Sequence, residues 1–565
     1  MQCLYLWIKT DTVGASGRSP LLMAGIMIKD VSSDKKWRKM KSIEIDKDQL
    51  TIDDVVAVSR GRVPVTVSAA GVERVDRATR LVARWVREEK VIYGITTGFG
   101  AMCNVTISPQ DTRSLQKKIL MSHAAGVGDP FPEDVVRAVM AIRIHDLYMG
   151  YSACTNRTLS HLVTFLNRGL TPVIPEKGSV GASGDLAPTA HLGLVLIGLG
   201  EAFFKGERMD GAKALEKVGL APLSLEAGEG LALINGTQVM TGIAALVVHD
   251  AIRLAKLADV ACAMSLEVLM GSSSEFDPRI HQVRPHPGQI ASARNMLRLT
   301  EDSQIILSHQ GCARVQDAYT LRCAPQIHGA SKDAVIHAGH VVGIEINSTT
   351  TNPLIFTDTE EIRLGGNFHG QPIAMAADYL SMGIAELGNV SERRIERMVN
   401  PQLSELPAFL VKNGGLNSGF MIAQYMAAAL VSENKVLSHP ACVDSIPTSA
   451  NKEDHVSMGT IAIRQCREIL NNVEHVLAVE MLCAAQAYDL LAETHRLSAG
   501  EGTREAYRTI REKIPFLDED RVLATDIGAM VSLIRSGVLL QAIEGAVGPL
   551  ELMNYESVSS FRVFS

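Results

Sequence analysis

The feature of this sequence that most limits its fold is a series of long helical patterns after residue 190. In residues 241–270, apolar side chains recur at spacings of three and four, or their sums, which is the period of one helix face. Small residues are also frequent there, and they allow helices to pack closely. Three further patterns of this kind cover residues 372–399, 418–437 and 456–490. Because few segments alternate between apolar and polar residues, we predict a mainly α fold.

The length of 565 residues, 46% of them apolar, is enough for two or three hydrophobic cores. We expect a mixed, loop-rich N-terminal domain over residues 40–238 and a bundle of long helices over residues 239–548. Residues 1–39 are interpreted as a disordered extension, with a start at Met40 as the alternative. Residues 549–565 are expected to form a C-terminal tail.

Charge and motif content exclude several classes of function. The net charge of −7 argues against nucleic acids and anionic membranes as partners. No P-loop and no Gly-x-Gly-x-x-Gly run opening a strand–helix unit is present, so a nucleotide cofactor is not expected. The nine cysteines include no Cys-x-x-Cys pair, which argues against a zinc site or a disulfide framework and suits the cytoplasm.

Two other patterns have ordinary explanations. Asp333, His337 and His340 lie about one helical turn apart and could form a three-ligand face. Nothing else in the sequence supports a metal, so we expect helix-surface residues there and no metal. The run from Gly230 to Val248 carries no charge over a length that could span a membrane. It holds four polar residues between Asn235 and Thr241, which favours a buried helix of a soluble protein.

The reactive centre that we predict is the tripeptide Ala182-Ser183-Gly184, inside the run Gly178–Pro188. Gly184 has no side chain, so in a tight turn its nitrogen can approach the carbonyl carbon of Ala182. Attack with loss of water closes a five-membered ring, and loss of the Ser183 hydroxyl as a second water leaves an exocyclic methylidene. Such a ring is an electrophile, which none of the twenty side chains provides. The alternative is an ordinary Gly/Ser turn before a helix.

The surroundings of this tripeptide distinguish it from a second copy, Ala15-Ser16-Gly17, which lies in a polar segment and is expected to be inert. The block Gly178–Gly193 reads GSVGASGDLAPTAHLG. It resembles the signature of the aromatic amino acid ammonia-lyases, which build a methylidene-imidazolone from Ala-Ser-Gly. The resemblance extends from about Ile43 to about Gly548. It implies an ammonia-lyase/fumarase-like fold and a cofactor formed from the chain itself.

Six other motifs carry the same resemblance. They are Val91–Gly100, Ser122–Gly126, Gly228–Gln238, Val315–Gln326, Gly365–Gly370 and Pro447–His455. The three glycines of the first motif predict a loop with unusual backbone angles. In the fourth, Tyr319 and Arg322 share a helix face, and a guanidinium can bind a carboxylate through two parallel bonds. A surface salt bridge is the alternative for Arg322, and half-buried packing is the alternative for Tyr93.

The resemblance assigns a role to each of these positions. The catalytic positions are Tyr93, Ala182, Ser183, Gly184, Asn235 and Tyr319. The substrate-binding positions are His123, Gln316, Arg322, Phe368 and Glu453. Tyr93 is expected to be the base, which requires a site that favours phenolate, because a free tyrosine has a pKa of about 10. Asn235 would position the amine and the electrophile, Tyr319 would assist amine elimination, and Arg322 would clamp the carboxylate.

The pocket motifs point to histidine as the substrate. Ser-His at residues 122–123 is the pairing of histidine ammonia-lyases, whereas phenylalanine enzymes typically carry Phe-Leu. Tyrosine enzymes can also have His there, so this pair excludes phenylalanine better than tyrosine. Glu453 also matches the histidine enzymes, where tyrosine and phenylalanine enzymes generally carry Gln. A carboxylate can accept a hydrogen bond from an imidazole, which a phenyl ring does not offer. Lys452, in place of the usual Gln, and Thr351, in place of the usual Asp, depart from the family.

The expected reaction is loss of ammonia from L-histidine to give urocanate. A tyrosine ammonia-lyase and a histidine or tyrosine 2,3-aminomutase, which returns the amine to the β-carbon, are the alternatives. A non-catalytic helical binding protein is the remote alternative, and the complete residue set argues against it. The resemblance also implies a homotetramer in which three chains assemble each active site.

Overall fold

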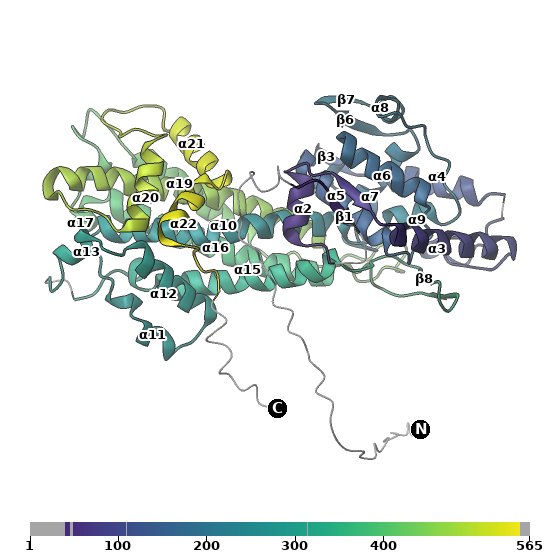
Figure 1. The fold of residues 1–565 in the computed structure, drawn as a ribbon, viewed down its shortest axis with the longest axis horizontal. Coiled ribbons are helices and arrows are strands. Elements are labelled where there is room, and N and C mark those ends of the chain that lie inside the picture. Colours follow the sequence, from purple (N-terminus) through teal and green to yellow (C-terminus); the bar gives the residue numbers. More distant parts are fainter. Residues whose placement is uncertain (1–39, 46–48, 109, 313–314, 554–565) are drawn as a thin grey trace, which may run out of the picture. The chain divides into compact units, whose positions relative to one another are not determined.

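Helices dominate the computed structural model, which describes residues 40–45, 49–108, 110–312 and 315–553 (Figure 1). The prediction of a mainly α fold is therefore confirmed. The predicted extension 1–39, with its Ala15-Ser16-Gly17, and residues 554–565 of the predicted tail lie outside the described residues. The predicted domain boundary coincides with the first residue of a long helix at Gln238, and it stays a prediction.

The N-terminal part consists of short and medium helices joined by loops. They are α2 (Ile52–Ser59), α3 (Ala69–Arg87), η1 (Gly100–Met102), α4 (Thr112–His123), α5 (Glu133–Tyr148), α6 (Asn156–Arg168), α7 (Leu186–Leu196), α8 (Gly211–Lys217) and α9 (Glu229–Ile234). The predicted loop at residues 91–100 is a loop. α4 ends at His123.

The strands have three or four residues each and form small sheets of two or three strands. β1 (Ile43–Ile45) pairs in parallel with β2 (Val65–Val67), and β3 (Val127–Pro130) pairs antiparallel with β5 (Pro175–Lys177). β4 (Leu170–Pro172), β6 (Glu201–Phe204) and β7 (Glu207–Asp210) form an antiparallel sheet in which Ala202 lies opposite Met209. β8 (Leu354–Phe356) pairs antiparallel with β9 (Glu361–Arg363).

The C-terminal part is built on five long helices. They are α10 (Gln238–Val268), α15 (Ala324–Ile346), α16 (Gln371–Val399), α18 (Met421–Leu437) and α19 (Gly459–His495). The shorter helices are η2 (Ser274–Phe276), α11 (Pro278–Gln282), α12 (Pro287–Leu299), α13 (Gln304–Ser308), α14 (Tyr319–Arg322), α17 (Pro401–Ser404), η3 (Ala408–Leu410), α20 (Glu501–Arg511), α21 (Leu523–Arg535) and α22 (Val538–Val547). The four long helical patterns in the sequence match α10, α16, α18 and α19 closely.

Helix α10 is buried along its whole length. It contacts helices of both the N-terminal and the C-terminal part. It packs against α15, α16 and α19 and also against α5 and α2 (Figure 1). At Gly242 a Cβ atom would come within 3.0 Å of the Val139 backbone nitrogen in α5. The lack of a side chain there lets the two helices approach closely, which fixes the N-terminus of α10 against α5.

The uncharged run 230–248 is not one helix, so that expectation was wrong. α9 ends at Ile234, and Gly236 has a φ of 128°, which breaks the helix before α10 begins. The run is nevertheless buried, as predicted. Within the described residues, α19 is long and apolar enough to cross a membrane, but 78% of its apolar window is buried inside the molecule.

Candidate active site

The predicted electrophile segment forms a tight turn directly before α7. Gly184 N–H donates to the carbonyl of Gly181 at 3.4 Å, which closes a turn around Ala182 and Ser183. Ser183 has a φ of 45°, a left-handed conformation that is strained by on the order of 1–3 kcal/mol in a residue other than glycine. Gly184 has a φ of 80°, and a Cβ atom there would lie 2.1 Å from the carbonyl oxygen of Gly236. The turn therefore accepts only glycine at position 184, which fits the predicted ring closure.

The residues after Asn235 run alongside this turn. Gly236 N–H donates to the Ser183 carbonyl at 3.3 Å, and Asp185 N–H donates to the Gly236 carbonyl at 2.8 Å. These two bonds hold Asn235 beside the predicted electrophile. The Asn235 amide group donates weakly to the Asn352 carbonyl at 3.4 Å. Its Oδ1 is buried without a hydrogen-bond partner among the described residues, so it is available to a ligand.

Asp185 is a buried residue of the site to which the sequence analysis gave no role. Its carboxylate accepts hydrogen bonds from the backbone N–H groups of Val239 and Met240 at 3.0 and 2.9 Å. It thereby caps the N-terminus of α10, and burial raises its pKa. Sequence could suggest a cap for the helix that follows Asp185. A cap on α10, which begins 53 residues later at Gln238, is visible only in three dimensions.

Glu453 reaches the same turn from a distant loop. Ser183 Oγ donates to Glu453 Oε1 at 3.2 Å, and Thr448 Oγ1 donates to Glu453 Oε2 at 2.9 Å. Backbone hydrogen bonds also pair Thr448 with Glu453 in both directions. Lys452 is exposed, and no ion pair with Glu453 is seen in the described part of the chain. The loop is thus closed at its base and directs Glu453, rather than Lys452, at Ser183.

Tyr93 and His123 lie within electrostatic range of Glu453. Tyr93 is half-buried, and its hydroxyl accepts a hydrogen bond from Gly100 N–H at 3.3 Å. Burial raises the pKa of Tyr93, the Gly100 N–H opposes this, and the Glu453 carboxylate raises the pKa further. The site of one chain therefore does not favour phenolate, contrary to expectation. Burial lowers the pKa of His123, and Glu453 acts against that shift.

The loop with Phe368 lies next to the electrophile segment. A Cβ atom at Gly370 would come within 3.0 Å of Ser457 Oγ, and one at Gly181 would come within 2.2 Å of the same oxygen. Phe368, two residues before Gly370, is half-buried. The adjacent His369 stacks on His455, with ring centroids 5.7 Å apart. The loops that carry Phe368 and Glu453 therefore meet beside the turn.

Three predicted residues lie elsewhere in the chain. Arg322 stacks on the Tyr319 ring at 4.6 Å, as their shared helix face predicts, and both Gln316 and Tyr319 are exposed. The carbonyl of Thr320, between them, contacts Cys262 Sγ at 4.0 Å. Cys262 lies 24 residues along α10 from Gln238, which is about 36 Å at 1.5 Å per residue.

One chain thus brings together eight of the predicted residues and leaves three apart. Those that share one region are Tyr93, His123, Ala182, Ser183, Gly184, Asn235, Phe368 and Glu453. Gln316, Tyr319 and Arg322 lie near the other end of α10.

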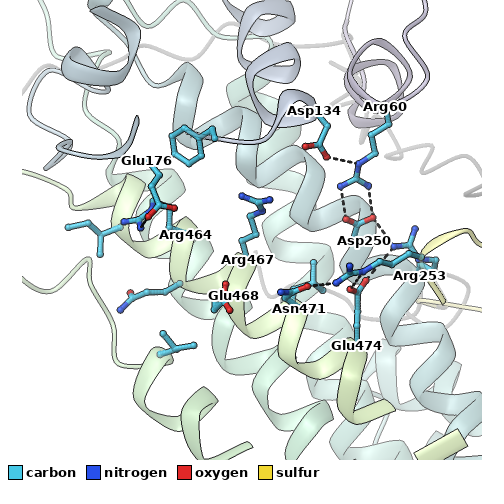
Figure 2. A pocket seen from close by; sticks show the side chains of 16 residues that line it. Arg60, Asp134, Glu176, Asp250, Arg253, Arg464, Arg467, Glu468, Asn471 and Glu474 are labelled. Atoms are coloured by element: carbon cyan, nitrogen blue, oxygen red, sulfur yellow. Dashed lines mark hydrogen bonds and ion pairs between the residues drawn. The ribbon is translucent and has the colours of Figure 1, made fainter. Parts of the chain in front are cut away.

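A cavity of about 700 Å³ lies away from this turn. Figure 2 shows that charged side chains form much of its wall and that several of them pair with one another. Arg60 bonds Asp134 and Asp250, and Arg253 bonds Asp250. None of the predicted site residues lines it. Because the predicted residues gather at the turn and not at this cavity, the turn at Ser183 is the better candidate for the active site.

Asp333, His337 and His340, the candidate metal ligands, lie on α15. Within the described ranges, no group of three or more His, Cys, Asp or Glu side chains could hold a metal ion. Asp333 accepts a hydrogen bond from Gly288 N–H at 3.1 Å, and the His337 ring packs edge-on against Tyr379. His337 and His340 are exposed on α15, as the surface interpretation predicts.

The chain is similar to known proteins over most of its length. Residues 50–512 match the family model described as aromatic amino acid lyase. The chain is 56% identical over 508 residues to a histidine ammonia-lyase of Alkaliphilus oremlandii, which covers 90% of this chain and 99% of the relative.

Two solved structures are similar over almost the whole chain. One is histidine ammonia-lyase from Trypanosoma cruzi, with 40% identity, coverage of 93% and 99%, and a TM-score of 0.84. The other is tyrosine aminomutase from Streptomyces globisporus, with 38% identity, coverage of 90% and 100%, and a TM-score of 0.84.

Proposed function

The chain belongs to the aromatic amino acid lyase family, and from this premise we propose that it removes ammonia from L-histidine to release urocanate. The observation that carries the choice of histidine is the Glu453 carboxylate, hydrogen-bonded to Ser183 at 3.2 Å and within electrostatic range of His123. An imidazole can donate to this carboxylate, which phenyl cannot. The 56% identity to a histidine ammonia-lyase supports the same choice.

The cofactor of the reaction would be a methylidene-imidazolone made from Ala182, Ser183 and Gly184. When formed, it supplies an electrophile that turns the substrate amine into a better leaving group. The left-handed Ser183 and the requirement for glycine at position 184 support its formation in this turn. No metal and no nucleotide are part of the proposal.

The remaining steps are assigned to side chains. Tyr93 would take the weakly acidic β-proton, and Asn235 would hold the amine beside the turn. Glu453 and His123 would bind the imidazole, and Phe368 would pack against a ring. Arg322 and Gln316 would bind the carboxylate end of the substrate, and Tyr319 would assist departure of the amine.

The separation of these residues within one chain supports shared active sites. Arg322 and Tyr319 belong to α14, about 36 Å from the turn along α10, so a second copy of the chain would have to supply them. A guanidinium brought in this way would also lower the pKa of Tyr93, which one chain alone raises. A homotetramer is the assembly we propose.

We also propose a cytoplasmic location. The described cysteines form no disulfide with one another, which suits a reducing compartment.

The similarity to a tyrosine aminomutase keeps a second candidate function in view. The deciding experiment is incubation of the purified protein with L-histidine, L-tyrosine and L-phenylalanine, followed by identification of the products. We expect urocanate from histidine and little reaction of the others. A β-amino acid would identify a mutase, and faster turnover of tyrosine than of histidine would contradict the substrate assignment.

A further inference from the structure

Helix α5 carries a buried pair of charged residues, Arg143 and Asp146, and Arg143 contacts Asn235. The two residues are 1% and 2% exposed, in a stretch of α5 whose side chains are all buried. Arg143 Nη1 and Asp146 Oδ2 are 3.7 Å apart. A buried charged pair is weak evidence for stability, because the loss of hydration offsets most of the attraction. The pair therefore calls for an explanation other than stability.

Arg143 caps the end of the helix that leads into Asn235. Its Nη1 donates to the Asn235 carbonyl at 2.8 Å and to the Ala232 carbonyl at 3.4 Å. The last carbonyls of a helix have no partners within it, and a cation at the C-terminus also interacts favourably with the helix dipole. The guanidinium of Arg143 on α5 thus supplies hydrogen bonds to two carbonyls at the end of α9.

This cap fixes the backbone of Asn235 on both sides. Asn235 N–H donates to Leu231 within α9, and its carbonyl accepts from Arg143. The next residue, Gly236, pairs with Ser183 and Asp185 of the electrophile turn. The side chain of Asn235 has only one weak bond of its own, so its position depends on the backbone that Arg143 holds.

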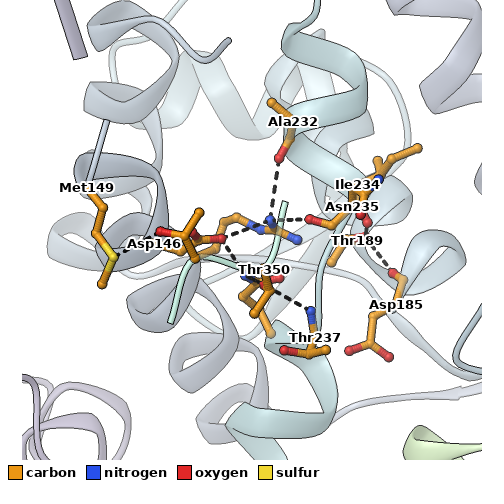
Figure 3. Close-up of polar contacts among 12 residues, drawn as sticks. Asp146, Met149, Asp185, Thr189, Ala232, Ile234, Asn235, Thr237 and Thr350 are labelled. Atoms are coloured by element: carbon orange, nitrogen blue, oxygen red, sulfur yellow. Dashed lines mark hydrogen bonds and ion pairs between the residues drawn. The ribbon is translucent and has the colours of Figure 1, made fainter. Parts of the chain in front are cut away.

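Asp146 extends the same network to the start of α10. Its Oδ2 accepts from Gln238 Nε2 at 2.7 Å, and the same nitrogen donates to Thr350 Oγ1 at 2.8 Å. Thr350 Oγ1 also accepts from Thr237 N–H at 3.4 Å. Contacts from α5 therefore reach residues on both sides of Asn235–Gly236, as Figure 3 shows for Asp146, Thr237 and Thr350.

We propose that Arg143 is a positioning residue for the reaction, which holds Asn235 so that its carboxamide meets the substrate amine beside the electrophile turn. The proposal rests on the proposed function, because Asn235 matters to catalysis only if the chain is an ammonia-lyase. Arg143 touches no reacting atom and acts through Asn235. Lysine in its place would keep the charge, but its ammonium would lie one bond short of Nη1, the nitrogen that makes both carbonyl contacts.

The test is a double-mutant cycle with Arg143→Lys and Asn235→Ala. We expect Arg143→Lys alone to lower kcat by about 10- to 100-fold, since small misplacements at an active site have effects of that size. In the Asn235→Ala background the same change should lower kcat by less than about threefold, because residues that act through one another are not additive. Equal losses in both backgrounds would overturn the proposal.

Arg137→Lys is the matched control. Arg137 lies six residues earlier in α5, is 2% exposed, and also donates to backbone carbonyls, those of Val58, Ser59 and Leu166. It should lower the melting temperature while leaving kcat unchanged. A comparable loss of kcat in this control would show that any buried arginine of α5 matters, which would overturn the specific role of Arg143.

A second measurement does not depend on activity. Hydrogen–deuterium exchange of the peptide that covers residues 231–240 should be faster in Arg143→Lys than in wild type and unchanged in Arg137→Lys. Unchanged exchange in Arg143→Lys would overturn the positioning role even in an active enzyme. If Arg143→Lys does not fold, Arg143→Gln, which retains an N–H donor without a buried charge, is measured in its place with the same expected outcomes.

Wild-type protein is assayed in parallel with histidine and tyrosine. Absence of turnover of both would overturn the proposed function and, with it, the role of Arg143, whereas turnover with unchanged exchange would overturn the role of Arg143 alone.

Discussion

Ser183 donates a hydrogen bond to the Glu453 carboxylate at 3.2 Å, although 270 positions of sequence separate the two residues. The residue predicted to become the electrophile and the residue predicted to recognise the substrate ring are therefore direct neighbours. Dehydration of Ser183 would remove this hydroxyl donor. Glu453 Oε1 would then be free to accept a hydrogen bond from the substrate, which couples formation of the cofactor to readiness of the pocket.

The mass of the intact protein tests the electrophile. We expect wild-type protein to be lighter than its sequence by two water molecules, and Ser183→Ala to lose nearly all activity because it cannot form the methylidene. Intact mass spectrometry and a histidine assay measure both. Ser16→Ala is the control and should change neither. An active wild-type protein of unshifted mass would exclude the methylidene-imidazolone.

Glu453→Gln should change both specificity and pH dependence. It removes the charge that pairs with imidazole, so histidine turnover should fall sharply and the gap to tyrosine should narrow or reverse. The Glu453 charge also raises the pKa of Tyr93. The rate rises with pH as a base loses its proton, so the rising limb of kcat/KM should move to lower pH in the variant.

A profile of kcat/KM against pH for both proteins measures this shift. Lys452→Gln, which changes an exposed neighbour, should leave the limb in place. A limb at the same pH in Glu453→Gln would mean that Glu453 does not act on Tyr93.

Arg322→Lys tests the carboxylate anchor. Lysine keeps the positive charge but lacks the planar fork, so kcat/KM should fall by more than about tenfold, or about 1.4 kcal/mol. Steady-state kinetics with histidine measure the effect. Near-normal kinetics would assign the carboxylate to another residue.

Mixed oligomers test whether sites are shared between chains. Ser183→Ala and Arg322→Ala should each be inactive alone. Co-expressed, they should recover part of the wild-type activity, because some sites would combine an intact Ser183 from one chain with an intact Arg322 from another. Differently tagged chains allow the mixed oligomers to be purified. Mixed oligomers as inactive as either parent would indicate that each site is built within one chain.

Asp146→Asn should change the pH dependence of stability. Burial raises the pKa of Asp146 from 3.8 to about 7. Between these two pH values Asp146 holds a proton in the folded chain but has released it in the unfolded chain. Titration of Asp146 therefore makes the free energy of unfolding of wild type fall as pH rises. Asparagine does not titrate. The melting temperature of the variant minus that of wild type should therefore increase from about pH 4 to about pH 7. A constant difference would place the Asp146 pKa near its ordinary value.

Local sequence pattern was sufficient for most of the helical architecture. The apolar period over residues 372–399 predicts α16 (Gln371–Val399) almost to the residue, because it reflects a helix face packed on neighbours. α19 continues to His495, five residues beyond its predicted end, and in this extension Leu491 is buried in a hydrophobic cluster with Ile305 and Ala499. The break at Gly236 was missed, since an apolar run shows no period by which to divide α9 from α10.

The sequence by itself determined which residues we predict to carry the chemistry, because the Ala182-Ser183-Gly184 run and the spacing of Tyr319 and Arg322 are local properties of the chain. Only the tertiary structure decided which of them meet. It brings Glu453 to Ser183, brings Arg143 to the carbonyl of Asn235, and holds Arg322 near the far end of α10. The physical reason is that burial and hydrogen bonding between distant segments depend on how helices pack, and no local spacing records that packing.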